Sequence, residues 1–227
     1  MRLLPETLRW RGPLILSLMM LREALSFLLY WHVFHIFQTD IQQAPARTQA
    51  DKEFDVKMYA GGADLERVIA EVASMGQMAA AEIESRFDRG QAVAVAYARN
   101  EAVGYSWISF SGDCELVWGT RCIVRPDEAV FHGSFTRPQW RGLGVHGSLD
   151  AKMSSYARRQ GRFRIFGWVS VLNKPSLSLV KRLRKRKIMT LILVHIRGTN
   201  WVYRKAIGAA LESHFSIRPA SPRGRNL

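Results

Sequence analysis

The sequence predicts an α/β or α+β fold in which helices pack on a sheet. Short apolar runs rich in β-branched and aromatic residues alternate along the chain with segments of helical periodicity. The chain has 227 residues, 48% apolar and 23% charged, which is the composition of a globular protein with a sizeable core. Its two cysteines are too few for a disulfide scaffold or a four-cysteine zinc site.

The strands are predicted from apolar runs that are bounded by turn residues. They cover residues 30–37, 54–59, 91–98, 102–110, 129–135, 162–172, 188–196 and 201–207. The polar residues 99–101 predict a hairpin turn between the third and fourth of these runs. The segment over residues 114–126 is expected to be irregular.

Three helices are predicted from apolar periodicity between capping and breaking residues. Asp64 is placed to cap a helix over residues 65–86. A second helix is expected over residues 145–159. Asn173 is placed to cap the third helix, which is expected to end in the basic run over residues 181–187.

The first fifty residues form an apolar extension that contains the predicted strand over residues 30–37. Its apolar run over residues 13–21 stops at Arg22 and Glu23, short of the about 20 apolar residues that a membrane-spanning helix needs. We expect the extension to fold with the rest of the chain, and peripheral membrane contact through residues 13–37 is the alternative. No signal-peptide cleavage pattern follows, so we expect a cytoplasmic protein.

Charge is distributed unevenly along the chain. After the extension over residues 1–50, residues 51–136 carry 8 basic and 14 acidic side chains, and residues 137–227 carry 20 basic and 2 acidic, a net +18. The second half therefore favours an anionic partner: a phosphate-rich cofactor, an acidic carrier protein, a lipid surface or nucleic acid. We expect one domain over residues 51–208 and a basic, disordered tail over residues 209–227.

One segment between a predicted strand and a predicted helix carries a chemical signal. It reads Gln139-Trp140-Arg141-Gly142-Leu143-Gly144. Glycines let an anion approach the backbone closely, and the N–H groups at a helix N-terminus favour its charge. Gly142 and Gly144 supply that approach, and Arg137 and Arg141 add positive charge nearby. The third glycine and the later acidic residue of a dinucleotide-binding fold are absent.

This segment resembles the hallmark of the GCN5-related N-acetyltransferase (GNAT) superfamily, Gln/Arg-x-x-Gly-x-Gly/Ala, which Gln139-x-x-Gly142-x-Gly144 satisfies. A second feature similar to the family is Asn173, which follows a predicted strand and precedes a small residue and a helix. The resemblance covers residues 54–207. It implies a mixed, mostly antiparallel sheet that is splayed into a V and flanked by helices.

The resemblance also implies an activity. The protein would be an N-acyltransferase that moves an acetyl or longer acyl group from coenzyme A to an amine acceptor by direct attack on the thioester. Acetyl-coenzyme A or another acyl-coenzyme A would be the donor, no metal would take part, and an amino sugar or amino acid is the favoured acceptor. The implied donor-binding residues are Phe135, Thr136, Arg137, Gln139, Arg141, Gly142, Leu143, Gly144, Val145, Asn173 and Ser176.

The acceptor amine must lose a proton before attack, so we expect a general base. Glu128 is the first candidate, because lysine acetyltransferases of the superfamily place a glutamate at this spacing before the position of Gln139. His132, further along the same strand, is the second candidate, as a base or an acceptor-site ligand. Many members carry a tyrosine general acid where this chain has Val180, so the thiolate is expected to leave unaided or to take its proton from another group.

Three alternatives remain open. An acidic acyl carrier protein could replace coenzyme A as the donor, in a synthase of N-acyl amino acids, and the basic second half would suit its docking. A non-catalytic nucleic-acid- or ribosome-binding protein is less favoured, because neither an aromatic RNA platform nor a recognition-helix pattern is present. A catalytically inactive family member acting as a regulator is the third, and Val180 supports it. Cys114 and Cys122 are interpreted as unpaired structural thiols.

Overall fold

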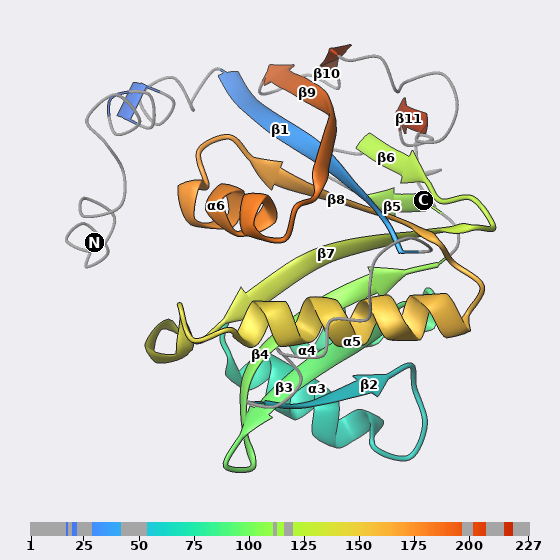
Figure 1. Cartoon of the computed structure of the whole chain (residues 1–227). Helices are drawn as coiled ribbons and strands as arrows, with labels where there is room; N and C mark the ends of the chain where they lie inside the picture. Colours follow the sequence, from blue (N-terminus) through green and yellow to red (C-terminus); the bar gives the residue numbers. More distant parts are fainter. Residues whose placement is uncertain are drawn as a thin grey trace, which may run out of the picture. The chain divides into compact units, whose positions relative to one another are not determined.

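The computed structural model describes residues 17, 20–21, 29–41, 54–110, 113–115, 120–196, 202–207 and 216–219 (Figure 1). The chain divides into two compact units. We call the first the central unit, which comprises Thr39–Cys114 and Cys122–Gly167. We call the second the terminal unit, which comprises Met1–Gln38, Glu115–Arg121 and Trp168–Leu227.

The central unit is built on five strands in the hydrogen-bonded order β8-β7-β4-β3-β2. Their bounds are β2 Asp55–Tyr59, β3 Ala92–Ala98, β4 Glu101–Ser109, β7 Glu128–Thr136 and β8 Arg164–Ser170. Neighbouring strands are antiparallel except β7 and β8, which run parallel with Glu128 opposite Arg164 and Phe131 opposite Gly167. The predicted mixed, mostly antiparallel sheet is confirmed.

Strand β3 shows how this sheet holds helices on both faces. The helices of the unit are α3 Leu65–Ser74, α4 Ala80–Asp88 and α5 Val145–Arg159. Ala92, Ala94 and Ala96 belong to the core cluster that includes the buried side of α5, and Val93 and Val95 belong to the cluster that includes α3 and α4. This alternation follows from the period of two along a strand. The small alanine side chains leave room for α5 to lie across the sheet (Figure 1).

The terminal unit contains three strands in the hydrogen-bonded order β10-β9-β1. Its elements are β1 Leu29–Asp40, α6 Lys174–Arg182, β9 Arg186–Ile196 and β10 Val202–Ile207. Strand β1 pairs antiparallel with β9, from Leu29 opposite Ile196 to Gln38 opposite Arg186. The predicted strand over residues 30–37 and the closing hairpin are confirmed, and the expected domain bounds stay a prediction. Three short strands, β5 Asp113–Glu115, β6 Thr120–Ile123 and β11 Ser216–Pro219, form a separate sheet in the order β11-β6-β5.

Membrane contact depends on a segment that the structure describes only in part. Within the described residues, no helix combines the length and the apolar character needed to cross a bilayer. Of residues 13–37, residues 29–37 belong to β1, and most of the others lie outside the described residues. Peripheral membrane contact therefore stays a prediction.

The single helix predicted over residues 65–86 is wrong, because the chain forms α3 and α4 there. Helix α3 ends at Ser74, and Gly76 follows with φ +74°, a left-handed conformation that ends a helix. Asp64 stands at the N-cap position of α3 as predicted. Its carboxylate makes an ion pair with Arg67 at 3.1 Å and no cap hydrogen bond.

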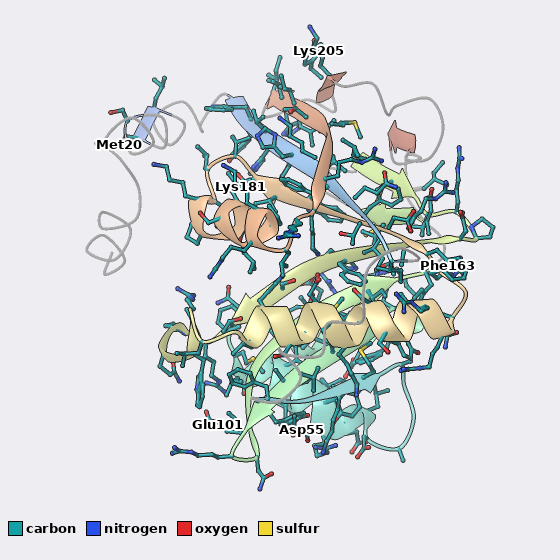
Figure 2. All side chains as sticks on the ribbon, in the orientation of Figure 1. Met20, Asp55, Glu101, Phe163, Lys181 and Lys205 are labelled. Atoms are coloured by element: carbon teal, nitrogen blue, oxygen red, sulfur yellow. The ribbon has the colours of Figure 1, made fainter. Side chains whose placement is uncertain are left out.

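The β3–β4 turn is one residue shorter than predicted. Arg99 and Asn100 both have positive φ, at 52° and 66°, and together they form a two-residue hairpin turn. Glu101 therefore begins β4, with its side chain exposed at the turn (Figure 2). The segment over residues 114–126 is not irregular throughout, because it contains parts of β5 and β6. The tail predicted to be disordered contains β11.

The basic run over residues 181–187 does not end a helix. Helix α6 ends at Arg182, and Arg184 has φ +53°, which turns the chain out of the helical path. The last residues of the run begin β9, where the Arg186 guanidinium donates to Gln38 Oε1 at 3.0 Å. The run therefore spans a helix end, a turn and a strand start, so its charges do not share one helix face.

A bulge in β7 and a close contact at β4 shape the end of the sheet. Tyr105 lies opposite Phe135 and Trp107 lies opposite His132, so β7 carries one residue more than β4 between these pairs. At Gly104, an added Cβ would lie 2.8 Å from the Phe135 carbonyl oxygen and 3.0 Å from a methyl carbon of Val145. Only glycine lets β4 lie this close to the end of β7 and the start of α5.

Replacing Gly104 with alanine is expected to destabilise the fold by about 1–3 kcal/mol, the range for overpacking a well-packed core. The added methyl group must displace backbone at the end of β7, which cannot rotate away as a flexible side chain would. Denaturant unfolding measures the effect. Gly167→Ala is the matched control with a milder contact, 3.2 Å to the Phe131 carbonyl oxygen. A Gly104→Ala protein as stable as wild type would contradict this account of the packing.

Candidate functional site

The loop between β7 and α5 has the geometry of an anion-binding backbone. After the short 3-10 helix η2 Pro138–Trp140, Gly142 has φ +84° and Gly144, the N-cap of α5, has φ +96°. Both are left-handed conformations that favour glycine. A Cβ added at Gly142 would find no atom within 4 Å, so the space above this backbone is open. The first N–H groups of the 15-residue helix α5 have no partners within the helix and face the start of this loop.

Two arginines fix the base of the loop. The backbone N–H of Arg137 donates to the Val103 carbonyl at 2.9 Å, and its Nε donates to the Ala102 carbonyl at 2.9 Å. These bonds hold the start of the loop against β4. Arg141 Nε donates to the Thr136 carbonyl at 3.2 Å, which closes the loop on the end of β7. Both arginines therefore position the loop, and their direct contact with a donor stays a prediction.

The other predicted loop residues divide into exposed and buried side chains. Gln139, Gly142 and Leu143 are exposed, and Leu143 is 52% exposed, which is high for a large apolar side chain. Val145 is 1% exposed and packs in the core, so only its backbone N–H is placed to meet a ligand. The ring of Phe135 is half-buried and lies against Tyr105.

Glu128 lies at the first residue of β7 with its side chain fully buried. Its Oε2 accepts from the backbone N–H of Arg125 at 3.1 Å, and its Oε1 lies 3.6 Å from Arg164 Nη2. Among the described residues, Oε1 has no hydrogen-bond partner. A buried carboxylate oxygen without a hydrogen-bond partner is unusual. It can accept a hydrogen bond from a water molecule or a proton from a substrate.

Burial raises the pKa of Glu128 above its ordinary value, and the N–H of Arg125 and the charge of Arg164 oppose the shift. A raised pKa brings a carboxylate closer to the proton affinity that a general base needs near neutral pH. Arg164 also pairs with Asp127, so its charge is shared between two carboxylates. The environment of Glu128 therefore suits proton transfer.

His132 lies on β7 with both ring nitrogens engaged. Arg86 Nη1 lies 3.2 Å from Nδ1, and Ser109 Oγ lies 2.9 Å from Nε2. An arginine can only donate, so Nδ1 accepts and the ring proton belongs on Nε2, where it points to Ser109. The lone pair that would accept a proton is therefore occupied by Arg86. The rise of about 3.3 Å per strand residue separates Glu128 and His132 by roughly 13 Å, so one amine contacts only one of them directly.

Asn173 and Ser176 belong to the terminal unit, in contrast to the loop and the two base candidates. Asn173 Oδ1 accepts from the Ser176 backbone N–H at 3.2 Å, which confirms the predicted helix cap. Both side chains are exposed or half-buried at the start of α6. Val180 is buried in α6 and offers no hydroxyl group. Contact of Asn173 and Ser176 with a donor stays a prediction.

Sequence reasoning did not find the residues around His132. Arg86 reaches it from α4 and also stacks over the Trp107 ring at 5.2 Å, and Ser109 reaches it from the end of β4. Ser109 in turn lies beside Cys114. The two contacts of His132 join positions 46 and 23 residues apart in the sequence, so no local pattern predicts them.

Comparison with known proteins bears on the fold. No family model matches the chain. The chain is 34% identical to an uncharacterised N-acetyltransferase of Methanocaldococcus jannaschii over 70 residues, which make up 31% of this chain and 30% of that relative. An acetyltransferase of the GNAT family from Colwellia psychrerythraea aligns with TM-score 0.53 and 10% identity, over 73% of this chain and 56% of that one. A GCN5-related N-acetyltransferase from Sphaerobacter thermophilus aligns with TM-score 0.52 and 14% identity, over 86% of this chain and 58% of that one. The chain has the GNAT fold.

The resemblance stated from the sequence is thus confirmed at the level of the fold. On the GNAT fold of this chain, the motif residues Gln139, Gly142 and Gly144 lie between β7 and α5, as the sequence predicts. The chain spans 30% of the curated relative and less than two thirds of each of the two solved structures.

Proposed function

We propose that this chain is an N-acyltransferase that moves an acetyl or longer acyl group from coenzyme A to an amine. The observation that carries the proposal is the open, left-handed glycine loop that joins β7 to α5 in a GNAT fold. The geometry fits a pyrophosphate, because the backbone at Gly142 is unobstructed and a helix N-terminus follows it. The net +18 of residues 137–227 adds to the attraction for a donor with several phosphate charges.

In this proposal the backbone N–H groups of residues 142–145 hold the pyrophosphate and so fix the position of the thioester. The N–H of Arg141 already donates to the Pro138 carbonyl at 3.2 Å, so Arg141 contributes charge and not a backbone donor. Glu128 accepts the proton of the acceptor amine, directly or through one water at Oε1. The amine nitrogen forms a bond to the thioester carbonyl carbon, the bond from carbon to sulfur breaks, and the coenzyme A thiolate leaves. Val180 supplies no proton, so the thiolate takes its proton from solvent.

Glu128 is favoured over His132 as the base. Glu128 has an oxygen without a hydrogen-bond partner among the described residues, whereas His132 Nδ1 already accepts from Arg86. Protonating His132 at Nδ1 would break that bond and place two positive charges side by side. We propose that His132 helps to shape the region that binds the acceptor amine.

The acceptor is proposed to be a small-molecule amine, with an amino sugar or an amino acid favoured. An acyl carrier protein in place of coenzyme A stays an alternative for the donor. The exposed charges of the basic run over residues 181–187 suit an acidic surface, but no contact within the described residues favours the carrier over coenzyme A.

A thermal-shift series tests the proposal. Coenzyme A, acetyl-coenzyme A, longer acyl-coenzyme A species and an acyl carrier protein are each added to the full chain. A donor present at 100 times its Kd stabilises the fold by about 2.7 kcal/mol, which raises Tm by roughly 5–10 °C for a chain of this size. The rank order of the acyl chains identifies the donor. The absence of any shift with every coenzyme A species at millimolar concentration would overturn the proposal.

A further inference from the structure

Two thiols of the central unit lie near Ser109, the residue that contacts His132 Nε2. Ser109 ends β4, Cys114 lies on β5, and Cys122 lies on the neighbouring strand β6. Ser109 Oγ lies 4.0 Å from Cys114 Sγ, and Cys122 Sγ donates to the Cys114 carbonyl oxygen at 3.3 Å. Both cysteines are free and buried, with 2% of Cys114 and none of Cys122 exposed.

The hydrogen bonds of the cluster run in one direction. Arg86 can only donate, so it donates to His132 Nδ1 and leaves the ring proton on Nε2. His132 Nε2 then donates to Ser109 Oγ, which leaves the Ser109 hydroxyl proton for Cys114 Sγ. A row of donors that starts at a permanent cation therefore ends on one sulfur atom. Such a row stabilises the thiolate over the thiol.

The pKa values of the two thiols are shifted in opposite directions. Contact with the Cys122 side chain, and then with those of His132 and Ser109, lowers the pKa of the Cys114 thiol, although burial opposes the shift. The hydrogen bond with Cys114 and burial raise the pKa of Cys122. Of the two thiols, Cys114 is thus the one that more readily forms a thiolate, and Cys122 is the one that more readily keeps its proton. This division of roles is the one that an attacking thiol and a resolving thiol require.

We propose that Cys114 is a peroxide-sensitive thiolate and that Cys122 is its resolving thiol. The Cys114 thiolate attacks one oxygen of a hydroperoxide, the O–O bond breaks, and the departing oxygen leaves as hydroxide or alkoxide and takes a proton from solvent. Cys114 becomes a sulfenic acid. The Cys122 sulfur then forms a bond to Cys114 Sγ, and the sulfenic oxygen leaves as water with the Cys122 proton. The peroxide is reduced by two electrons, and a dithiol reverses the disulfide.

The burial of the pair sets which reagents react. Cys114 is 2% exposed, so we expect a hydroperoxide, the smaller reagent, to reach its sulfur more readily than a bulky maleimide does. The described residues hold no group of three or more His, Cys, Asp or Glu side chains arranged to bind a metal ion. The proposal is independent of the acyltransferase activity, because its readout is the covalent state of the two sulfurs.

Intact mass spectrometry of the native full chain tests the proposal. Hydrogen peroxide is expected to remove two hydrogen atoms from wild type, dithiothreitol to restore them, and peptide mapping to join Cys114 to Cys122. In Cys122→Ser the reaction should stop at a Cys114 sulfenic acid that a dimedone probe captures. In Cys114→Ser, Cys122 should give no such adduct over the same time. Ser109→Ala should slow the oxidation of Cys114 at least threefold, because a donor to its sulfur is lost.

Several results would overturn the proposal. If wild-type protein stays reduced in hydrogen peroxide, the proposed pairing of Cys114 with Cys122 is ruled out. That result needs no variant for its interpretation. An equal rate of sulfenic acid formation at Cys122 in Cys114→Ser would reverse or abolish the assigned roles. Faster reaction with a bulky maleimide than with peroxide in folded wild type would show an ordinary exposed thiol. Where a serine variant does not fold, the alanine variant at the same position takes its place.

Discussion

Replacing Glu128 with glutamine is expected to lower the rate of acyl transfer by roughly 10²–10⁴-fold, with donor binding preserved. Glutamine keeps the shape of the side chain and can still accept from the Arg125 N–H. It removes the one buried carboxylate oxygen that has no hydrogen-bond partner among the described residues, and with it the proton acceptor. The loss should fall on kcat, because the proton is transferred only as the amine attacks.

Steady-state kinetics with a fixed acyl-coenzyme A and an excess of amine measure this effect. Asp127→Asn is the matched control, because it makes the same chemical change at the adjacent residue. Asp127 is half-exposed and pairs with Arg164, so its loss should change turnover only a few-fold. A loss below threefold for Glu128→Gln would move the role of the base to His132 or to water.

The stability of the Glu128→Gln protein separates loss of the base from loss of the fold. Because burial raises the pKa of Glu128, the folded state binds its proton more tightly than the unfolded state. The resulting stabilisation is present below the unfolded pKa, near 4.5, and is lost as pH rises through the higher folded pKa. At neutral pH the variant should therefore be no less stable than wild type, as measured by denaturant unfolding at acid and neutral pH.

Replacing Gly142 with aspartate is expected to weaken coenzyme A binding at least tenfold. Asparagine and aspartate are the side chains that best tolerate the left-handed backbone, and no atom lies within 4 Å of the position that their Cβ would take. The variant should therefore fold, and its carboxylate would lie where the pyrophosphate is proposed to bind. Two unit charges about 4 Å apart repel by about 4 kcal/mol near a protein surface and by about 1 kcal/mol in bulk water, and about 1.4 kcal/mol is a tenfold change in Kd.

Gly142→Asn is the control for this change, because it has the same shape without the charge. Calorimetric titration should give a smaller loss for asparagine than for aspartate, and the difference should shrink as salt is added. Equal Kd values for the two variants at low salt would show that the donor phosphates do not lie at this loop.

Elements with strong local signals could be predicted from the sequence. Helix α5 has the bounds that its periodicity and the glycines around it predict, and the Asn173 cap makes the hydrogen bond expected of it. The glycine motif was found because backbone approach to an anion requires particular residues at particular spacing. Conversely, the division into α3 and α4 depends on the conformation of Gly76, which a helical pattern can also tolerate.

Contacts between residues far apart in the sequence could not be predicted from local sequence patterns. Strand β11 pairs with β6 across nearly a hundred residues, so neither partner carries a complete strand signal by itself. The contact between Arg86 and His132 joins α4 to β7, across 46 residues of sequence. Cys114 is interpreted from the sequence as a structural thiol, because its link to Arg86 runs through His132 and Ser109 and exists only in the folded chain.

Amide hydrogen exchange with and without acetyl-coenzyme A measures whether the loop between β7 and α5 binds the donor. If backbone N–H groups of residues 142–145 hold the pyrophosphate, saturating donor should slow exchange strongly in peptides that cover the loop and the first turn of α5. Exchange in β3, whose N–H groups are already bonded within the sheet, should be unchanged and serves as the internal reference. Saturable donor binding that protects other segments and leaves residues 142–145 exchanging at the free rate would contradict the account.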